Sequence, residues 1–81
     1  MKQKIFHALE RGKAVTLSTM FSTYTLRGWW KRDVLGRHMV GAQVTTPEGE
    51  YIPLRSRKEL DDFLMKVIRE GYRGNKIRVS Y

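Results

Sequence analysis

The chain has 81 residues, no cysteine and a strong excess of positive charge, because 16 Lys and Arg face only 8 Asp and Glu and give a formal net charge of +8. This length predicts one domain over residues 1–81, and the missing cysteine excludes disulfides, cysteine-ligated zinc and thiol catalysis. The apolar runs are far too short for a membrane span and nothing indicates an oxidising compartment, so we expect a cytoplasmic protein.

Two segments have the apolar spacing of helices. Residues 2–11 predict a short helix that Gly12 ends, with Ile5, Phe6 and Leu9 on its apolar face. Residues 56–70 predict the main helix, whose apolar residues recur at i, i+3, i+4, i+7 and i+8 and fall on one side: Leu60, Phe63, Leu64, Val67 and Ile68.

The ends of the main helix carry capping signals. Ser56 stands three residues before Glu59, the spacing of a capping box in which the serine oxygen accepts from the Glu59 amide and the carboxylate reaches the Ser56 amide. At the other end, Gly71 is placed to adopt a left-handed turn, and Tyr72 is placed to pack on Val67. We therefore expect the helix to end at Gly71.

The segment 14–30 is rich in β-branched and aromatic residues, which favours strands. Its alternation slips near Thr19 to Ser22, so it predicts either one bulged strand or two short strands with a bend. A competing interpretation makes Thr19 to Arg32 a helix and gives a helix-turn-helix with the first helix. The many β-branched residues argue against that helix.

The remaining segments alternate strands with turns. Residues 33–36 predict a turn, 40–45 a strand, and 46–50 a hairpin turn built on Pro47 and Gly49. Residues 51–54 return as a partner strand, which lies at an edge or leaves Pro53 facing outward, because Pro53 has no amide hydrogen. Residues 73–76 predict a last turn, and 77–81 a last strand.

This order, α-β-β-β-α-β, predicts an α+β fold. Two helices with one apolar stripe each suit one face of an antiparallel sheet of three to five strands. The predicted core consists of Ile5, Phe6, Leu9, Val15, Leu17, Val40, Ala42, Val44, Ile52, Leu60, Phe63, Leu64, Val67, Ile68, Ile77 and Val79.

The strongest candidate site is the pair Trp29 and Trp30 between basic residues. In an extended strand the two indoles point to opposite faces, so one can join the core while the other needs a different cover. An exposed indole among cations suits single-stranded nucleic acid, because the ring stacks on a base while cations hold phosphates: Arg27, Lys31, Arg32 and Arg37. The alternative is that both indoles are buried, as large aromatic side chains usually are, one in the core and the other under the first helix or in a dimer contact.

Two further basic groups are candidates for phosphate contacts. Arg55, Arg57 and Lys58 surround the start of the main helix, where free amides and the helix dipole attract anions. The alternative is that Ser56 and Glu59 already cap this helix and the cations are solvated. Arg73, Lys76 and Arg78 form a strip if Arg78 faces solvent, and the alternative is a charged edge that discourages aggregation.

Support for catalysis is thin. The sequence has no Gly-rich phosphate loop, metal-ligand cluster or nucleophile motif. His7 and His38 have no carboxylate at a fixed spacing, and Asp61 and Asp62 diverge by about 100° on a helix. We therefore expect a protein without enzymatic activity, metal or other cofactor.

Two functional hypotheses follow. The leading one is a small basic nucleic-acid-binding protein whose partner is DNA or RNA, because an excess of +8 attracts polyanions. The rival is a protein-interaction module, an inhibitor or adaptor of a larger machine, of a size common among phage and mobile-element accessory proteins.

An exposed aromatic residue flanked by Arg also suits a protein interface, and an open edge strand could pair a partner or form a homodimer. Anionic membrane comes last, because the first helix is too short and too weakly apolar to insert.

Overall fold

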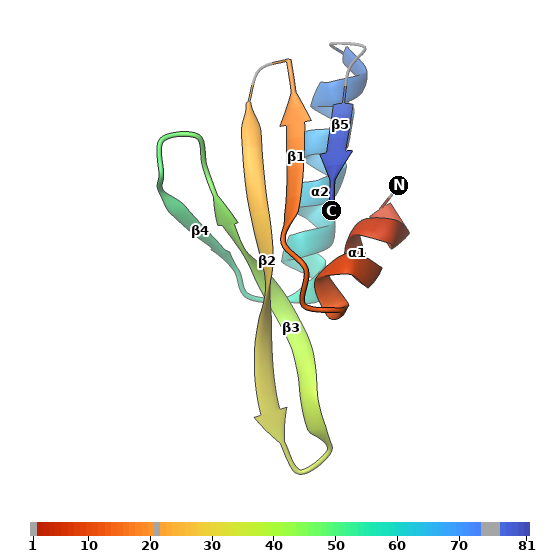
Figure 1. Ribbon diagram of the computed structural model, residues 1–81, viewed down its shortest axis with the longest axis vertical. Helices are drawn as coiled ribbons and strands as arrows, with labels where there is room; N and C mark the ends of the chain where they lie inside the picture. Colours follow the sequence, from red (N-terminus) through yellow and green to blue (C-terminus); the bar gives the residue numbers. More distant parts are fainter. Residues whose placement is uncertain (1, 21, 74–76) are drawn as a thin grey trace.

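The computed structural model describes residues 2–20, 22–73 and 77–81, without the side chains of residues 71–73 and 77. The elements in chain order are α1 (Lys2–Glu10), β1 (Val15–Thr19), β2 (Thr23–Asp33), β3 (Gly36–Thr45), β4 (Tyr51–Leu54), α2 (Arg57–Arg73) and β5 (Ile77–Ser80). The described strands form one five-stranded antiparallel sheet in the order β4-β3-β2-β1-β5 (Figure 1). The predicted α+β class is confirmed.

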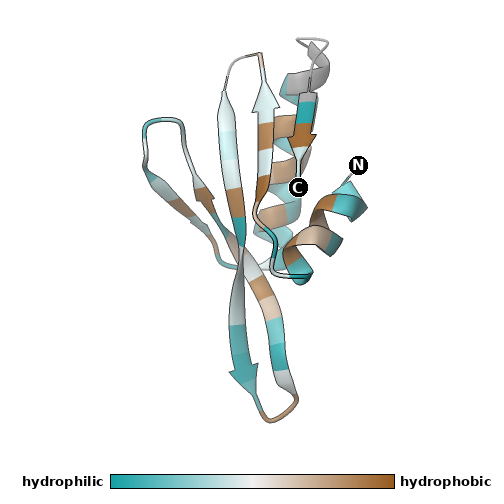
Figure 2. Cartoon of the chain, in the orientation of Figure 1, coloured by the Kyte–Doolittle hydropathy of each residue, from teal (hydrophilic) through white to brown (hydrophobic). Residues whose placement is uncertain are grey.

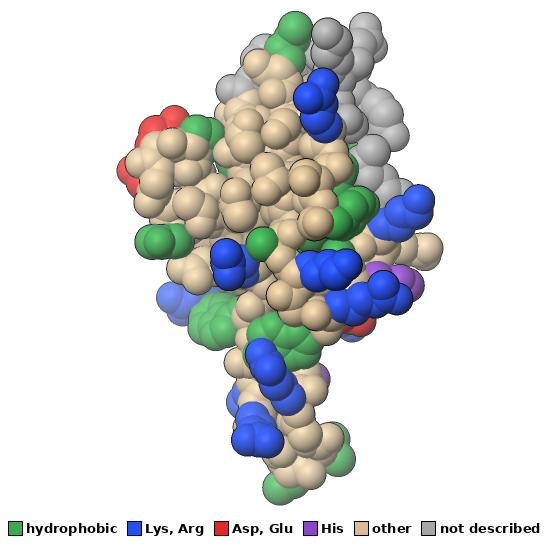
Figure 3. Space-filling view, viewed as in Figure 1, with side chains coloured by type: hydrophobic (Ala, Val, Ile, Leu, Met, Phe, Trp, Pro, Cys, Tyr) green, Lys and Arg blue, Asp and Glu red, His purple; other side chains and the backbone are tan. Residues whose placement is uncertain are grey.

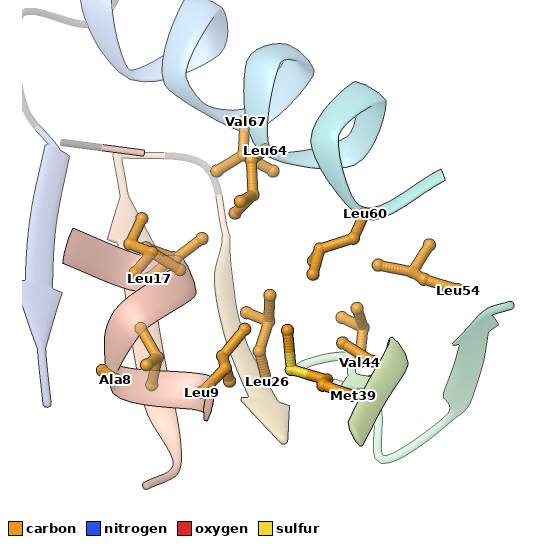
Figure 4. Close-up of a cluster of buried hydrophobic side chains, with 13 residues drawn as sticks. Ala8, Leu9, Leu17, Leu26, Met39, Val44, Leu54, Leu60, Leu64 and Val67 are labelled. Atoms are coloured by element: carbon orange, nitrogen blue, oxygen red, sulfur yellow. The ribbon is translucent and has the colours of Figure 1, made fainter. Parts of the chain in front are cut away.

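The core lies between the two helices and one face of the sheet. Alternate residues of β1 and β2, such as Leu17 and Leu26, point to this side and meet Leu9 of α1 and Leu64 of α2 (Figure 4). The main helix shows the same separation, because Leu60, Leu64 and Val67 are buried while its charged positions are mostly exposed, and Figure 2 shows apolar and hydrophilic residues alternating along it. Both helices therefore cover one face and leave the other open, as the sequence predicts.

Most of the predicted core is confirmed. Nine of the predicted residues are buried: Ile5, Leu9, Val15, Leu17, Ala42, Val44, Leu60, Leu64 and Val67. Phe6, Phe63 and Val79 are partly buried and pack against this core, while Ile68 is half-buried. The side chain of Ile77 lies outside the described residues. The buried residues that the sequence analysis missed are Ala8, Leu26, Met39 and Leu54.

A β-bulge explains why Val40 is not in the core. Trp29 pairs with Gly41 while Trp30 pairs with Met39, so Val40 is an extra residue on β3. An extra residue reverses the alternation beyond it, and Met39 is buried in place of Val40. Ile52, also predicted as core, is 38% exposed because it lies on the edge strand β4, where neighbours cover it on one side only.

Two strands and a hairpin occupy the ambiguous region 14–33. β1 and β2 are separate antiparallel strands, with Val15 opposite Leu26 and Ser18 opposite Thr23. The proposed helix over Thr19 to Arg32 is wrong, because β2 runs through most of it. β-branched and aromatic side chains fit the pleated surface better than a helix.

The capping box of α2 forms with one change. Ser56 Oγ accepts a hydrogen bond from the Glu59 amide at 3.1 Å, as predicted. The Glu59 carboxylate, however, accepts from the Arg55 amide at 2.7 Å rather than from that of Ser56. The predicted end at Gly71 is also wrong, because α2 continues to Arg73. Glycine permits a left-handed turn without requiring one, and a helix tolerates it at a cost of about 1 kcal/mol. The predicted packing of Tyr72 on Val67 lies outside the described side chains.

Both predicted hairpin turns are present. Gly36 adopts a φ of +106° behind Asp33, whose carboxylate accepts from the Leu35 amide at 2.8 Å. Gly49 adopts a φ of +84° and donates to the Thr46 carbonyl at 2.9 Å. The predicted turn at 73–76 lies largely outside the described residues. Within the described residues, neither helix is long and apolar enough to cross a bilayer.

Gly41 gives a direct test of the packing between β3 and β4. A Cβ atom at this position would lie 1.9 Å from the Leu54 carbonyl oxygen, a backbone atom that cannot move aside alone. We expect Gly41→Ala to lower the free energy of unfolding by roughly 2–3 kcal/mol, a large effect for one methyl group. Urea denaturation measures it, and Gln43→Ala, an exposed position on the same strand, should change it by less than about 0.5 kcal/mol. An unchanged urea midpoint for Gly41→Ala would contradict this packing.

Candidate functional site

The face of the sheet that the helices leave open carries the candidate site. Because Leu26 of β2 points into the core, Arg27, Trp29 and Lys31 on the same strand point the other way. Gln43 of β3 stands opposite Arg27 and is exposed on the same face. We call Arg27, Trp29, Lys31 and Gln43 the open-face cluster.

Trp29 is the exposed indole of the pair. It is 44% exposed and lines a hollow of about 180 Å³ together with Gly28, Gln43 and Pro53. A second hollow of about 550 Å³ has Gln43 in common with it, and its other lining residues are Thr25, Arg27, Thr45 and Tyr51. The two hollows therefore lie on either side of Gln43 and involve residues of β2, β3 and β4.

The cations of the cluster flank the indole. Arg27 and Lys31 are exposed and lie two residues on either side of Trp29, hence about 7 Å along the strand. Among the described residues, neither forms an ion pair, because the pairs there join Lys2 to Asp61, Arg57 to Glu10 and His38 to Asp33. Figure 3 shows cations around the middle and lower parts of this view, whereas the upper sheet is mostly uncharged. The positive charge near Trp29 is therefore available to a ligand.

Trp30 lies on the opposite face. It is partly buried against the core, and the Arg37 guanidinium stacks 4.7 Å from the centre of its ring. Arg32 stands opposite Arg37 in the β2–β3 pair and shares this face. Arg32 and Arg37, predicted as phosphate contacts beside the exposed indole, are thus separated from Trp29 by the thickness of the sheet.

The basic residues at the start of α2 do not join the cluster as a group. Arg57 pairs with Glu10 of α1 and lies 5.8 Å from the centre of the Phe6 ring. Lys58 lines a hollow of about 690 Å³ between the helices, where Glu10 and Asp61 offset the charges of Lys58 and Arg57. The other lining residues are Gln3, Phe6 and His7.

Arg55 comes near the cluster with its backbone. Its backbone carbon would lie 3.1 Å from a Cβ at Gly41, which is the cross-strand partner of Trp29. Its amide donates to the Glu59 carboxylate, so a carboxylate already occupies part of the predicted phosphate seat at the helix start.

The predicted C-terminal strip lies apart from the cluster. Arg78 is exposed on the open face of β5, opposite Ser18 of β1. Ser18 in turn pairs with Thr23, six residues from Trp29 along β2, or about 20 Å. Lys76 and the side chain of Arg73 lie outside the described residues.

Comparisons with protein-family models, with curated proteins and with solved structures find no significant match. The fold and the site therefore rest on this chain alone. Within residues 2–20, 22–73 and 77–81, no three His, Asp or Glu side chains gather closely enough to hold a metal ion.

Sequence reasoning missed the uncharged part of this face. Gln43, Pro53 and Tyr51 line the hollows beside Trp29, and Tyr51 is 68% exposed. A signal was present, because Gln43 alternates with the buried Ala42 and Val44. Which of these residues meet across three strands depends on the register of pairing, which the sequence does not state.

Quenching separates the two indoles. In Trp30→Phe, the remaining Trp29 should be quenched strongly by acrylamide, because it is 44% exposed. In Trp29→Phe, the remaining Trp30 should emit at shorter wavelength and be quenched less, because it packs on the core under Arg37. Arg37→Ala in the Trp29→Phe background should raise the quenching of Trp30. Equal quenching of the two single-indole variants would contradict the assigned faces.

Proposed function

We propose that this chain is a nucleic-acid-binding protein without catalytic activity, and that it binds through the open-face cluster. One observation carries the proposal: Trp29 is 44% exposed on the uncovered face, with Arg27 and Lys31 on both sides of it. An indole left in water forgoes the hydrophobic gain of burial, and a ligand that covers it restores that gain.

The ligand chemistry follows from the side chains. The flat face of Trp29 can stack on an unpaired base, which is worth about 1–3 kcal/mol per base and tolerates any sequence. Arg27 and Lys31 can hold the phosphates on either side of that base. Gln43, between the two hollows, offers an amide donor and acceptor to a base edge. We infer that the cluster binds single-stranded nucleic acid.

A second candidate, a protein-interaction module, is favoured by the edge strand β4. Tyr51 and Ile52 are both exposed there, and among the described strands β4 pairs with β3 alone. A partner protein could add a strand along this edge and bury Tyr51. Retention of one stoichiometric protein from nuclease-treated lysate by the wild-type chain, lost with Tyr51→Ser, would favour this candidate.

Removing the exposed indole tests the leading proposal. We expect Trp29→Ala to weaken binding of a labelled single-stranded oligonucleotide roughly 5- to 150-fold, from the loss of one stacked base. Fluorescence anisotropy at low salt measures this, and Trp29→Phe should recover part of the affinity. Lys66→Ala, on the exposed side of α2, is the control that changes charge away from the cluster and should have little effect. Equal affinity of wild type and Trp29→Ala would refute the stacking role.

Salt dependence tests the phosphate contacts. Each phosphate neutralised on a single strand contributes about 0.7 to the slope of log affinity against log salt, because it releases counterions. The double variant Arg27→Ala/Lys31→Ala should therefore lower the slope by roughly 1.4, while a matched pair of exposed cations on α2, Lys66→Ala/Arg69→Ala, should leave it nearly unchanged. The absence of any binding to DNA or RNA at low salt would end the proposal.

A further inference from the structure

The β2–β3 hairpin extends beyond the core as an arm, which we define as residues 31–38. The last pair that packs on the core is Trp30 with Met39. Beyond it the pairs are Lys31 with His38, Arg32 with Arg37 and Asp33 with Gly36. Figure 1 shows this hairpin projecting away from the helices. Three pairs beyond the core correspond to a projection of roughly 10 Å.

The arm ends in an apolar tip with a defined shape. Val34 is 101% and Leu35 is 91% exposed, the highest values among the exposed large apolar residues. The tip is fixed from within, because the Asp33 carboxylate accepts from the Leu35 amide at 2.8 Å and Gly36 adopts a φ of +106°. Figure 2 shows the closing loop as hydrophobic and the adjoining strand end as hydrophilic. Two apolar side chains are thus held in water at the furthest point of the molecule.

The arm carries cations on both of its faces. Lys31 is the cation on the face of Trp29, where His38 and Asp33 also lie, while Arg32 and Arg37 share the face of Trp30. Like charges directly opposite each other destabilise a strand pair, so the Arg32–Arg37 pair works against the arm when no ligand is bound. A polyanion along both faces would turn this repulsion into attraction.

We propose that the arm enters the major groove of a DNA duplex adjoining the single strand on Trp29, so that the preferred partner is a single-strand/duplex junction. The inference rests on the proposed function and names its substrate class. The major groove is about 12 Å wide and about 8.5 Å deep and admits a two-stranded ribbon. The projection of the arm, roughly 10 Å, is comparable to the depth of this groove. Phosphates line both walls of the groove, as cations line both faces of the arm. Thymine methyl groups on its floor offer apolar contact to Val34 and Leu35.

Duplex DNA fits these features better than the alternatives. The major groove of A-form RNA is deep and too narrow for side chains to read. An anionic bilayer would accept an apolar tip with cations behind it, but it presents its phosphates in one plane. The cations of the arm lie at two heights and on both faces, which suits the two phosphate walls of a groove better than one plane.

One molecule can hold both parts of such a junction. Val34 follows the end of β2 and lies five residues beyond Trp29, which corresponds to about 17 Å along an extended chain. The arm would follow the groove while the unpaired strand crosses the open-face cluster behind it. Lys31 belongs to both surfaces and would contact a phosphate close to the branch point.

The test compares a blunt duplex, the same duplex with a single-stranded tail, and the tail strand alone, by anisotropy. The tip variant is Val34→Ser/Leu35→Ser. Both side chains are almost fully exposed, so the substitutions should not disturb the packing of the core. Met65→Ser, an exposed apolar residue on α2, is its matched control. We expect wild type to bind the tailed duplex about tenfold more tightly than either part, and the tip variant to lose about tenfold on both duplexes but nothing on the single strand. Trp29→Ala should lose affinity for the single strand and the tailed duplex, and keep the blunt duplex.

Three outcomes would overturn the inference. The tip variant could bind the tailed duplex as tightly as wild type, or it could lose the single strand equally. It could also lose binding to phosphatidylserine vesicles while keeping that to duplex DNA, which would assign the tip to a membrane. Failure of the proposed function appears elsewhere, in the single-strand titration, as no binding or as no effect of Trp29→Ala.

Discussion

The pairing of β2 with β3 determines the rest of the structure. Along β2 the side chains alternate, so Leu26 and Trp30 face the helices while Arg27, Trp29 and Lys31 face outward. On β3 one extra residue, Val40, shifts the pairing at this point and brings Met39 beneath the core. β2 is eleven residues long, with Leu26 buried in its first half and its last three residues exposed. A site with one indole inside and one outside follows directly from this register.

Several carboxylates on the helix side of the sheet are engaged in ion pairs or in the cap of α2. Glu10 and Asp61 pair with Arg57 and Lys2 between the helices, and Glu59 caps α2. Exposed ion pairs of this kind contribute little to stability, but they use carboxylates on the helix side of the sheet. The β2–β3 hairpin has one acidic residue, Asp33. Its carboxylate accepts from the Leu35 amide in the turn and lies 3.7 Å from His38. Arg27 and Lys31 on the open face and Arg32 on the arm form no ion pair among the described residues.

The sequence predicted the local features and missed those that depend on distant pairing. Helical spacing identified both helices, and turn residues such as Gly49 identified the hairpins, because these signals lie within a few residues. The Arg57–Glu10 pair joins positions 47 residues apart, and no local pattern predicts it. The bulge at Val40 is a property of the pairing between β2 and β3. The alternation of residues within β3 alone therefore predicted, wrongly, that Val40 is in the core. For the site, alternation predicted that the two indoles separate, but the partner residues on β3 and β4 required the register.

The arm separates the residues that would contact a partner from the residues that stabilise the fold. Apart from Arg37 on Trp30, the arm contributes nothing to the packed interior, and its tip is almost fully in water. Substitutions at Val34 and Leu35 should leave the unfolding equilibrium almost untouched while they change the choice of partner. Natural selection could thus recode or lengthen this hairpin at little risk to the scaffold, and a designer could exchange it as a module.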